Sequence, residues 1–258
     1  MRRRALGVYA VLVLAALYAP LAILAVFSFS ASPSQEWSGL SLRWYREMAE
    51  DRNIRACLWN TLVLSGTSMV FSTILGTVAA LAARDAFRGR RLYATLVSLP
   101  VMVPDIVLAI ALLLLFRAAG ATLSLWTAAI AHVTFNLSYV ALIVSARLQG
   151  LDRTLELAAQ DLGATPFAAF WKVTFPAILP GIVSGALLAF TLSFDDFVIT
   201  YFTTGPDSTT LPVLIYSKIR HSEAAVMRAL STVMLVASLG LIAGSLRLSR
   251  GPVAGGGR

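Results

Sequence analysis

The sequence predicts an all-α membrane protein with six transmembrane helices. Of its 258 residues, 58% are hydrophobic and only 13% are charged, and the mean hydropathy is +0.78, values that soluble domains rarely reach. A helix needs roughly 20 apolar residues to cross about 30 Å of hydrocarbon. Six stretches are long enough: 9–29, 61–83, 93–116, 123–146, 177–201 and 229–246. Since no long linker separates them, residues 1–258 are predicted to form a single transmembrane domain.

The positive charge of the chain follows this topology. The net charge is +8, but there is no soluble basic domain that would bind nucleic acid. The short inner loop 84–91 reads RDAFRGRR, whereas the outer loop 31–57 balances its arginines with acidic residues. By the positive-inside rule, both termini are predicted to be cytoplasmic. The first stretch follows MRRR without a convincing cleavage site and is read as a retained anchor.

The outer loop after the first span contains the amphipathic stretch LSLRWYREM. Its aromatic residues, together with Trp37, suit an interfacial belt. The single cysteine, Cys57, cannot form an internal disulfide.

The inner loop between the fourth and fifth spans, residues 147–176, is the most informative segment. Leu155, Ala158, Ala159 and Leu162 repeat at helical spacing and predict a short amphipathic helix. Gly163 follows where a helix end favours a left-handed residue. Thr165 can cap a second helix, with Pro166 at its first position, that would run to Pro176. Two short helices meeting at a glycine are expected to protrude under the membrane.

The stretch LAAQDLGATPFAAFWKVTFP resembles the EAA loop of binding-protein-dependent ABC importers. Leu157, Ala158 and Ala159 stand for EAA, Gly163 is the motif glycine, and residues 173–176 stand for the I-x-L-P ending. Leu157 replaces the motif glutamate, and Glu156 lies one position earlier. The resemblance implies a type I ABC importer permease fold whose coupling helix docks on a cytoplasmic ATPase. The implied docking residues are Glu156, Ala158, Ala159, Asp161, Gly163 and Pro176.

Several further stretches are similar to one branch, the second permease subunit of spermidine/putrescine importers. They include MVPDIVLAIALLLLF, HVTFNLSYV and SFDDFVITYFTTGPDSTTLP. The resemblance implies a polyamine permease of the bacterial inner membrane with three kinds of partner: an ABC ATPase dimer, a sister permease in a heterodimer, and an extracytoplasmic polyamine-binding protein. The chain has no Walker A sequence, so ATP hydrolysis would belong to a partner. No enzyme activity, cofactor or metal is expected of this chain.

Three acidic residues lie within apolar runs: Asp105, Asp195 and Asp196. An ionisable side chain in a span costs from about 2.5 kcal/mol upward, so such residues commonly mark a substrate path. In a straight third span, Asp105 would lie about 20 Å from Leu92, near the middle of the bilayer, after Pro100 and Pro104, which would open the helix. Asp195 and Asp196 would lie about 28 Å along the fifth span, at its outer mouth.

These carboxylates are predicted to form a cation path. Ser193 beside them and Trp44 from the first outer loop are predicted to line it, Trp44 through cation and apolar contacts with the methylene spacers of a polyamine.

Other interpretations stay open at this point. The aspartates would also be explained by headgroup positions or by cations from another subunit. Ferric ion is an alternative substrate, since carboxylates are hard oxygen ligands. A passive cation channel would not explain the loop 147–176. An intramembrane aspartyl protease would need Y-D and G-x-G-D contexts that are absent, and His132 and His221, outside any H-E-x-x-H, read as packed or interfacial residues.

Overall fold

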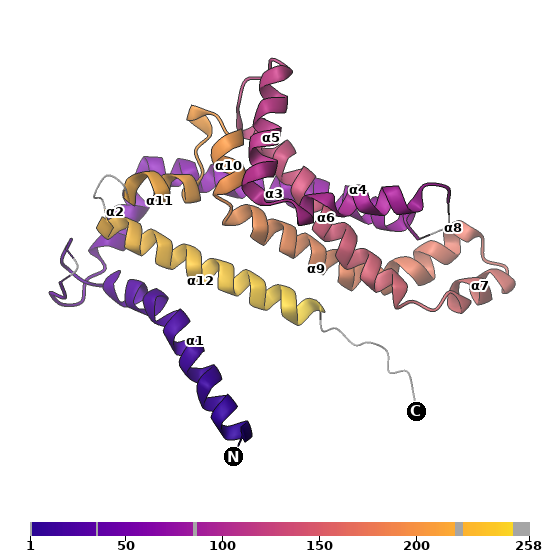
Figure 1. The fold of residues 1–258 in the computed structure, drawn as a ribbon, viewed down its shortest axis with the longest axis horizontal. Coiled ribbons are helices and arrows are strands. Elements are labelled where there is room, and N and C mark those ends of the chain that lie inside the picture. Colours follow the sequence, from indigo (N-terminus) through magenta and orange to yellow (C-terminus); the bar gives the residue numbers. More distant parts are fainter. Residues whose placement is uncertain (1, 35, 85–86, 220–223, 250–258) are drawn as a thin grey trace. The chain divides into compact units, whose positions relative to one another are not determined.

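The computed structural model describes residues 2–34, 36–84, 87–219 and 224–249, and Figure 1 shows that this part of the chain is built from helices. Its elements are α1 (Arg2–Phe27), α2 (Arg43–Glu50), α3 (Arg52–Ala82), α4 (Arg90–Met102), α5 (Asp105–Ala118), α6 (Leu125–Gln149), α7 (Thr154–Asp161), α8 (Pro166–Ala169), the π-helix η1 (Phe170–Thr174), α9 (Phe175–Phe194), α10 (Val198–Thr203), the 3₁₀-helix η2 (Pro206–Ser208), α11 (Leu211–Ile219) and α12 (Ala224–Ser249).

Within the described residues, five helical segments are long and apolar enough to cross a membrane: Tyr9–Phe27, Arg52–Ala82, Leu125–Gln149, Pro166–Phe194 and Ala225–Gly244. A sixth span exists if α4 and α5 are counted as one, and these two helices meet at an angle of 107°. The six spans expected from the sequence are therefore all found in the described residues if α4 and α5 together form one span.

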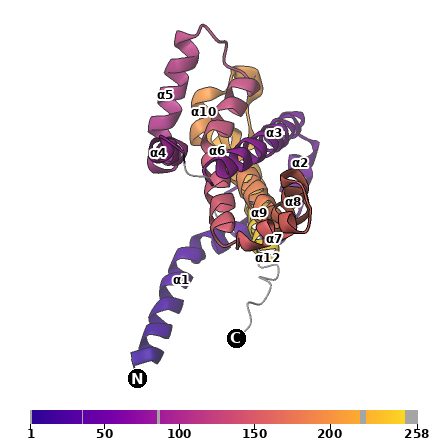
Figure 2. The same ribbon diagram turned by 90° about the vertical axis from the view of Figure 1, so that its right-hand side faces the viewer.

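The third span is broken and not straight (Figure 2). Val103 between α4 and α5 adopts an extended backbone, with φ −83° and ψ 134°, because the ring of the following Pro104 disfavours the helical conformation there. Pro104 then leads directly into α5. Asp105 is consequently the first residue of a new helix, so the straight third span expected from the sequence was wrong. The depth of Asp105 in the bilayer stays a prediction.

The fifth span also differs from the expectation of 177–201. The helix of the second half of the loop does not end at Pro176 but continues through α8, η1 and α9 as one helical run from Pro166 to Phe194. Proline lacks an N–H and crowds the preceding turn, and the wider π turn at Phe170–Thr174 accommodates it without ending the helix. At the other end the run ends at Phe194, so Asp195 and Asp196 lie in the break before α10.

The described chain divides into two compact units, and the single-domain organisation of residues 1–258 stays a prediction. One unit comprises Met1–Ala56 and Val213–Ala237, and the other comprises Cys57–Pro212 and Ser238–Arg258.

In the first unit, the loop after α1 is held by polar contacts from α2 and α12. Trp44 on α2 packs against Ala225 and Ala229 of α12, and its indole N–H donates to the carbonyl oxygen of Ser30 at 2.8 Å. The guanidinium group of Arg228 donates to the carbonyl oxygens of residues 32–34. The amphipathic stretch of this loop forms α2 from Arg43 onward.

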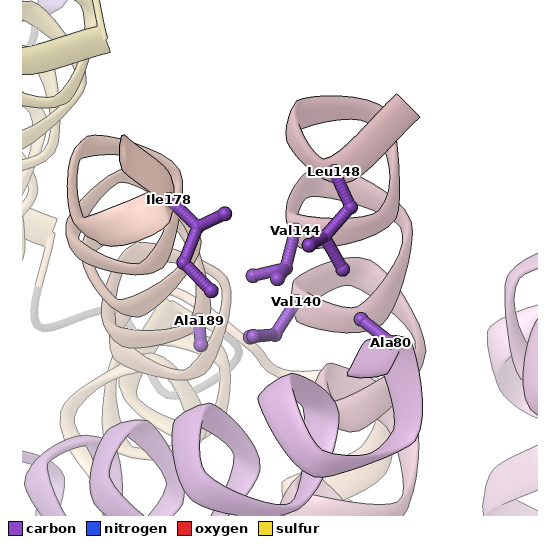
Figure 3. Packing of buried hydrophobic residues seen from close by; sticks show 6 residues of the cluster. All are labelled: Ala80, Val140, Val144, Leu148, Ile178 and Ala189. Carbon is purple, nitrogen blue, oxygen red and sulfur yellow. The ribbon is translucent and has the colours of Figure 1, made fainter. Parts of the chain in front are cut away.

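In the second unit, α6 is the central helix and packs against α4, α5, α9 and α10. One apolar cluster joins α3, α6 and α9, as Figure 3 shows; its buried members are Ala80, Val140, Val144, Leu148, Ile178 and Ala189. A second cluster joins α5 to α6 and α10 through Leu112, Phe135 and Ile199. This packing positions the polar residues described next.

Candidate functional site

The polar groups of the second unit concentrate where α9 ends and α10 begins. The side chain of Asp196 is only 14% exposed. Its Oδ2 accepts hydrogen bonds from the backbone N–H of Thr200 at 2.8 Å and from the Thr200 hydroxyl at 2.9 Å. A carboxylate in this position satisfies N–H groups that the first turn of a helix leaves without partners. Asp196 therefore fixes the start of α10.

His132 of α6 lies against this cap and is 2% exposed. Its Nδ1 is 3.0 Å from the Ser193 hydroxyl, and its Nε2 is 3.0 Å from the Thr200 hydroxyl and 3.4 Å from Asp196 Oδ2. The single hydroxyl proton of Thr200 is donated to Asp196, so Thr200 must accept from Nε2–H. Nδ1 on the other side of the ring faces the Ser193 hydroxyl.

Asn136, one helical turn after His132, extends the contacts toward α3. Its Nδ2 group donates to the Ser193 hydroxyl at 2.8 Å and to the Ser68 hydroxyl at 2.9 Å. The result is a buried hydrogen-bond chain that links α3, α6, α9 and α10. Its members, called the Ser68–Asp196 chain below, are Ser68, Asn136, Ser193, His132, Thr200 and Asp196.

The other two aspartates are exposed. Asp195 precedes the capping residue in the α9–α10 break, and Asp105 opens α5. No ion pair joins either carboxylate to another residue in the described ranges. The helices that follow them are neighbours, because α5 packs on α10. Asp105 and Asp195 therefore lie on neighbouring elements. Asp196, by contrast, is bonded to Thr200 and lies against His132.

Ser193 and Trp44, the other residues predicted to line a path, are both buried. Ser193 is 2% exposed, and its hydroxyl is engaged by Asn136 and His132. Trp44 is 7% exposed within the first unit. Their contact with a substrate stays a prediction.

The glycine elbow of the loop has the geometry that the sequence predicts. Gly163 adopts φ +92°, its N–H donates to the carbonyl of Gln160, and the N–H of Ala164 donates to the carbonyl of Ala159. These bonds form a Schellman motif at the end of α7. The hydroxyl of Thr165 accepts from the N–H of Ala168 at 3.2 Å and caps α8. Both helix ends are thus confirmed.

The other end of α7 is held by a carboxylate. The Thr154 N–H donates to Asp152 Oδ1 at 2.9 Å, and hydrogen bonds from Thr154 hold the pKa of Asp152 below its usual value.

Glu156 points toward the second unit's own helices and not away from them. Arg84, just beyond α3, forms an ion pair with Glu156 Oε2 at 2.5 Å, and the Thr174 hydroxyl donates to the same oxygen at 3.1 Å. The guanidinium group of Arg153 donates to the carbonyl oxygen of Arg84 at 3.1 Å. Glu156 thereby ties α7 to the end of α3 and to η1.

Other side chains of the loop are exposed, and several of them are large and apolar. Leu157 is 57% exposed, Phe167 is 74% exposed and Leu162 is 90% exposed. The predicted docking residues Ala158, Asp161, Gly163 and Pro176 are exposed as well, and Ala159 is half-buried. Exposed apolar surface of this kind marks a contact with a partner or a membrane.

Sequence reasoning missed His132, Asn136 and Thr200, the middle of the hydrogen-bond chain. A signal was present, because His132 and Asn136 stand four residues apart on one face of an apolar span, where buried polar side chains need partners. His132 is a packed residue, as the sequence led us to expect, and His221 lies outside the described residues.

Comparison with known proteins places these features in context. Residues 72–248 match the family model described as "binding-protein-dependent transport system inner membrane component". The chain is 41% identical over 241 residues to the putrescine transport system permease protein PotI of Escherichia coli strain K12, covering 88% of this chain and 85% of that protein. It is 35% identical over 246 residues to the spermidine/putrescine transport system permease protein PotC of the same strain, covering 95% and 93%.

Solved structures share the fold. A chain of a bacterial alginate ABC transporter, solved in complex with a pentasaccharide-bound periplasmic protein, superposes with a TM-score of 0.70 at 16% identity, covering 96% of this chain and 95% of that one. A chain of the MetNI methionine ABC transporter in an inward-facing conformation gives a TM-score of 0.65 at 19% identity, covering 78% and 98%. At these identities the likeness concerns the fold, which is that of a type I ABC importer permease.

Proposed function

Because the chain belongs to the family of inner-membrane components of binding-protein-dependent transport systems, we propose that it is a permease subunit of an ABC importer that carries polyamines into the cytoplasm. The observation that carries this proposal is the similarity to two polyamine permeases over most of the chain. The substrate and the partners are taken from those relatives and from the loop, and both termini are proposed to be cytoplasmic.

The exposed carboxylates support a cationic substrate. In this proposal Asp195 and Asp105 contact the ammonium groups of a polyamine, since neither has an ion-pair partner among the described residues. Asp196 and Ser193 act differently, because the Ser68–Asp196 chain holds both. They position the break that presents Asp195.

Replacing Asp195 or Asp105 with asparagine is expected to reduce putrescine and spermidine uptake about tenfold or more, because each change removes a charge-assisted contact. Uptake of the radiolabelled amines is measured in cells that co-express the chain with its neighbouring transporter genes, at matched membrane levels. Asp207→Asn is the control, since Asp207 is exposed in the η2 turn and is assigned no substrate contact.

Normal uptake in both variants would remove the carboxylates from the path and leave the importer assignment standing. If the wild-type system takes up no polyamine but accumulates ferric ion, the substrate proposal fails and the iron alternative replaces it. A passive channel would be indicated by uptake that persists when the ATPase is inactivated.

The loop is proposed to dock on one subunit of a cytoplasmic ABC ATPase dimer, which hydrolyses ATP for the transporter. A sister permease would complete the membrane part as a heterodimer, and an extracytoplasmic polyamine-binding protein would deliver the substrate. The exposed apolar side chains of Leu162 and Phe167 suit the docking surface. Glu156 would contribute by orienting the loop through Arg84 and Thr174.

Glu156→Arg is therefore expected to lower uptake and substrate-stimulated ATP hydrolysis several-fold, because it replaces the ion pair with Arg84 by a repulsion. Arg84→Glu is expected to behave alike, and the double exchange should recover much of the activity by restoring an opposite-charge pair. ATP hydrolysis by the purified complex is the readout, with complex recovery as the control for assembly. Additive losses in the double variant would show that the pair does not orient the loop.

A further inference from the structure

A pocket of about 510 Å³ lies in the second unit, outside the Ser68–Asp196 chain. It is bounded by the last turns of α3, the first two turns of α4 and the second half of α6. The start of the loop, through Leu151 and Arg153, closes one side. The pocket therefore lies at the end of the bundle that carries the loop, and of its lining residues the transport proposal uses only Arg84.

The rim of the pocket is positively charged. Arg84, Arg90 and Arg153 line it, and no aspartate or glutamate is among its described lining residues. Glu156 pairs with Arg84 from outside the lining. The first turn of α4 borders the pocket through Arg90 and Tyr93, and this helix start has no side-chain cap, so its positive dipole end adds to the arginine charge.

This charge decides the class of ligand. A polyamine would be repelled by the arginines, whereas a phosphate group would receive charge-assisted and bidentate hydrogen bonds from guanidinium groups. The pocket is consequently better suited to a phosphate group than to a cationic substrate.

The remaining walls are apolar and lead to an apolar helix face. Ala80, Val97 and Leu142 line the pocket, and along the adjoining α4 the side chains of Leu92 and Leu96 are 65% and 58% exposed. A soluble phosphate compound would leave these walls in contact with water, whereas an acyl chain would cover them. We propose that the pocket binds the phosphate headgroup of an anionic phospholipid, with its acyl chains along α4.

In the test, the purified and delipidated transporter complex is titrated with phosphatidylglycerol, and the affinity for this lipid is measured. Arg90→Gln is expected to weaken this binding about tenfold, the effect of losing roughly one charge-assisted hydrogen bond. The matched control is Arg91→Gln, which makes the same charge change on the same turn, outside the pocket lining, and should bind as the wild type does. Ala94→Phe fills the pocket from an exposed position on α4 without any change of charge and should also weaken binding.

Two further ligands distinguish the sources of the anion. Phosphatidylcholine with the same acyl chains should bind weakly, because its headgroup has no net charge. Glycerol phosphate should bind weakly, because it lacks the acyl chains. Equal binding of phosphatidylcholine, full binding of glycerol phosphate, or unchanged phosphatidylglycerol binding in both Arg90→Gln and Ala94→Phe would each overturn the proposal.

Discussion

Replacing His132 with leucine is expected to abolish uptake and to lower the melting temperature of the assembled transporter by several degrees. The leucine removes the imidazole contacts of the Ser193 hydroxyl at Nδ1 and of Thr200 and Asp196 at Nε2, and leaves only the bond from Asn136 to Ser193 and those from Thr200 to Asp196. Each buried hydrogen bond that is lost contributes about 0.5–1.5 kcal/mol, and one to a charged group contributes about 1.5–3 kcal/mol. The total exceeds the effect of most single substitutions, and it falls on the break that presents Asp195.

His132→Gln separates the two sides of the imidazole. A glutamine amide can place a donor near the position of Nε2 and keep the contact with Thr200 and Asp196, but it removes the ring nitrogen that faces the Ser193 hydroxyl. Intermediate stability and partial uptake are therefore expected.

Thr134→Val is the control for His132→Leu, because Thr134 lies on the same helix, is exposed, and bonds only the carbonyl oxygen of Ile130. Thermal unfolding of the purified complex and uptake at equal membrane levels provide the two measurements. A His132→Leu transporter with wild-type stability and uptake would show that the Ser68–Asp196 chain is dispensable.

Gly205→Ala is expected to be the most disruptive single-methyl change in the second unit. An added Cβ would lie 2.2 Å from the carbonyl oxygen and 2.9 Å from the carbonyl carbon of Leu123. These are backbone atoms just before α6, so no side-chain rotation relieves the contact. The residues after α10 must instead move away, which breaks the 2.7 Å hydrogen bond from the Thr127 hydroxyl to the carbonyl oxygen of Thr203. Overpacking of this kind costs about 1–3 kcal/mol, and more where backbone must shift.

The backbone of Gly205, with φ −94°, is one that alanine adopts freely, so the substitution tests the close approach alone. Gly66→Ala is its matched control, since a Cβ there meets nothing within 4 Å and alanine in a helix is favoured by roughly 0.5–1 kcal/mol. Thermal unfolding of the two variants should shift in opposite directions. A Gly205→Ala protein as stable as the Gly66→Ala protein would mean that the segment at Gly205 accommodates the methyl group.

Local signals explain what the sequence predicted correctly. The apolar runs defined the long helices, and Gly163, Thr165 and Pro166 defined the helix ends in the loop, because a cap depends on residues within a few positions. The break at Pro104 was also a local signal. Its angle of 107° was not predictable, because the direction of α5 depends on packing against α10, far along the chain.

The site residues were harder to predict for the same reason. Ser193 and Thr200 follow His132 by 61 and 68 positions, and Arg84 precedes Glu156 by 72. From the sequence alone, Asp195 and Asp196 are equally good candidates for a substrate path, since both are charged residues beside an apolar run. Only the positions of Thr200 and His132 separate the capping carboxylate from the exposed one.

The continuous helical run from Pro166 to Phe194 connects the loop at one end to the break that carries Asp195 at the other. Its 29 residues extend about 40 Å at about 1.5 Å per residue. If the ATPase tilts the loop end by about 10°, the end that carries Asp195 sweeps about 7 Å, with no relay of side chains between them. In the proposed function, the displacement of Asp195 would then be proportional to the length of this helix, and ATP-driven movement of the loop would reach Asp195 as a rigid rotation.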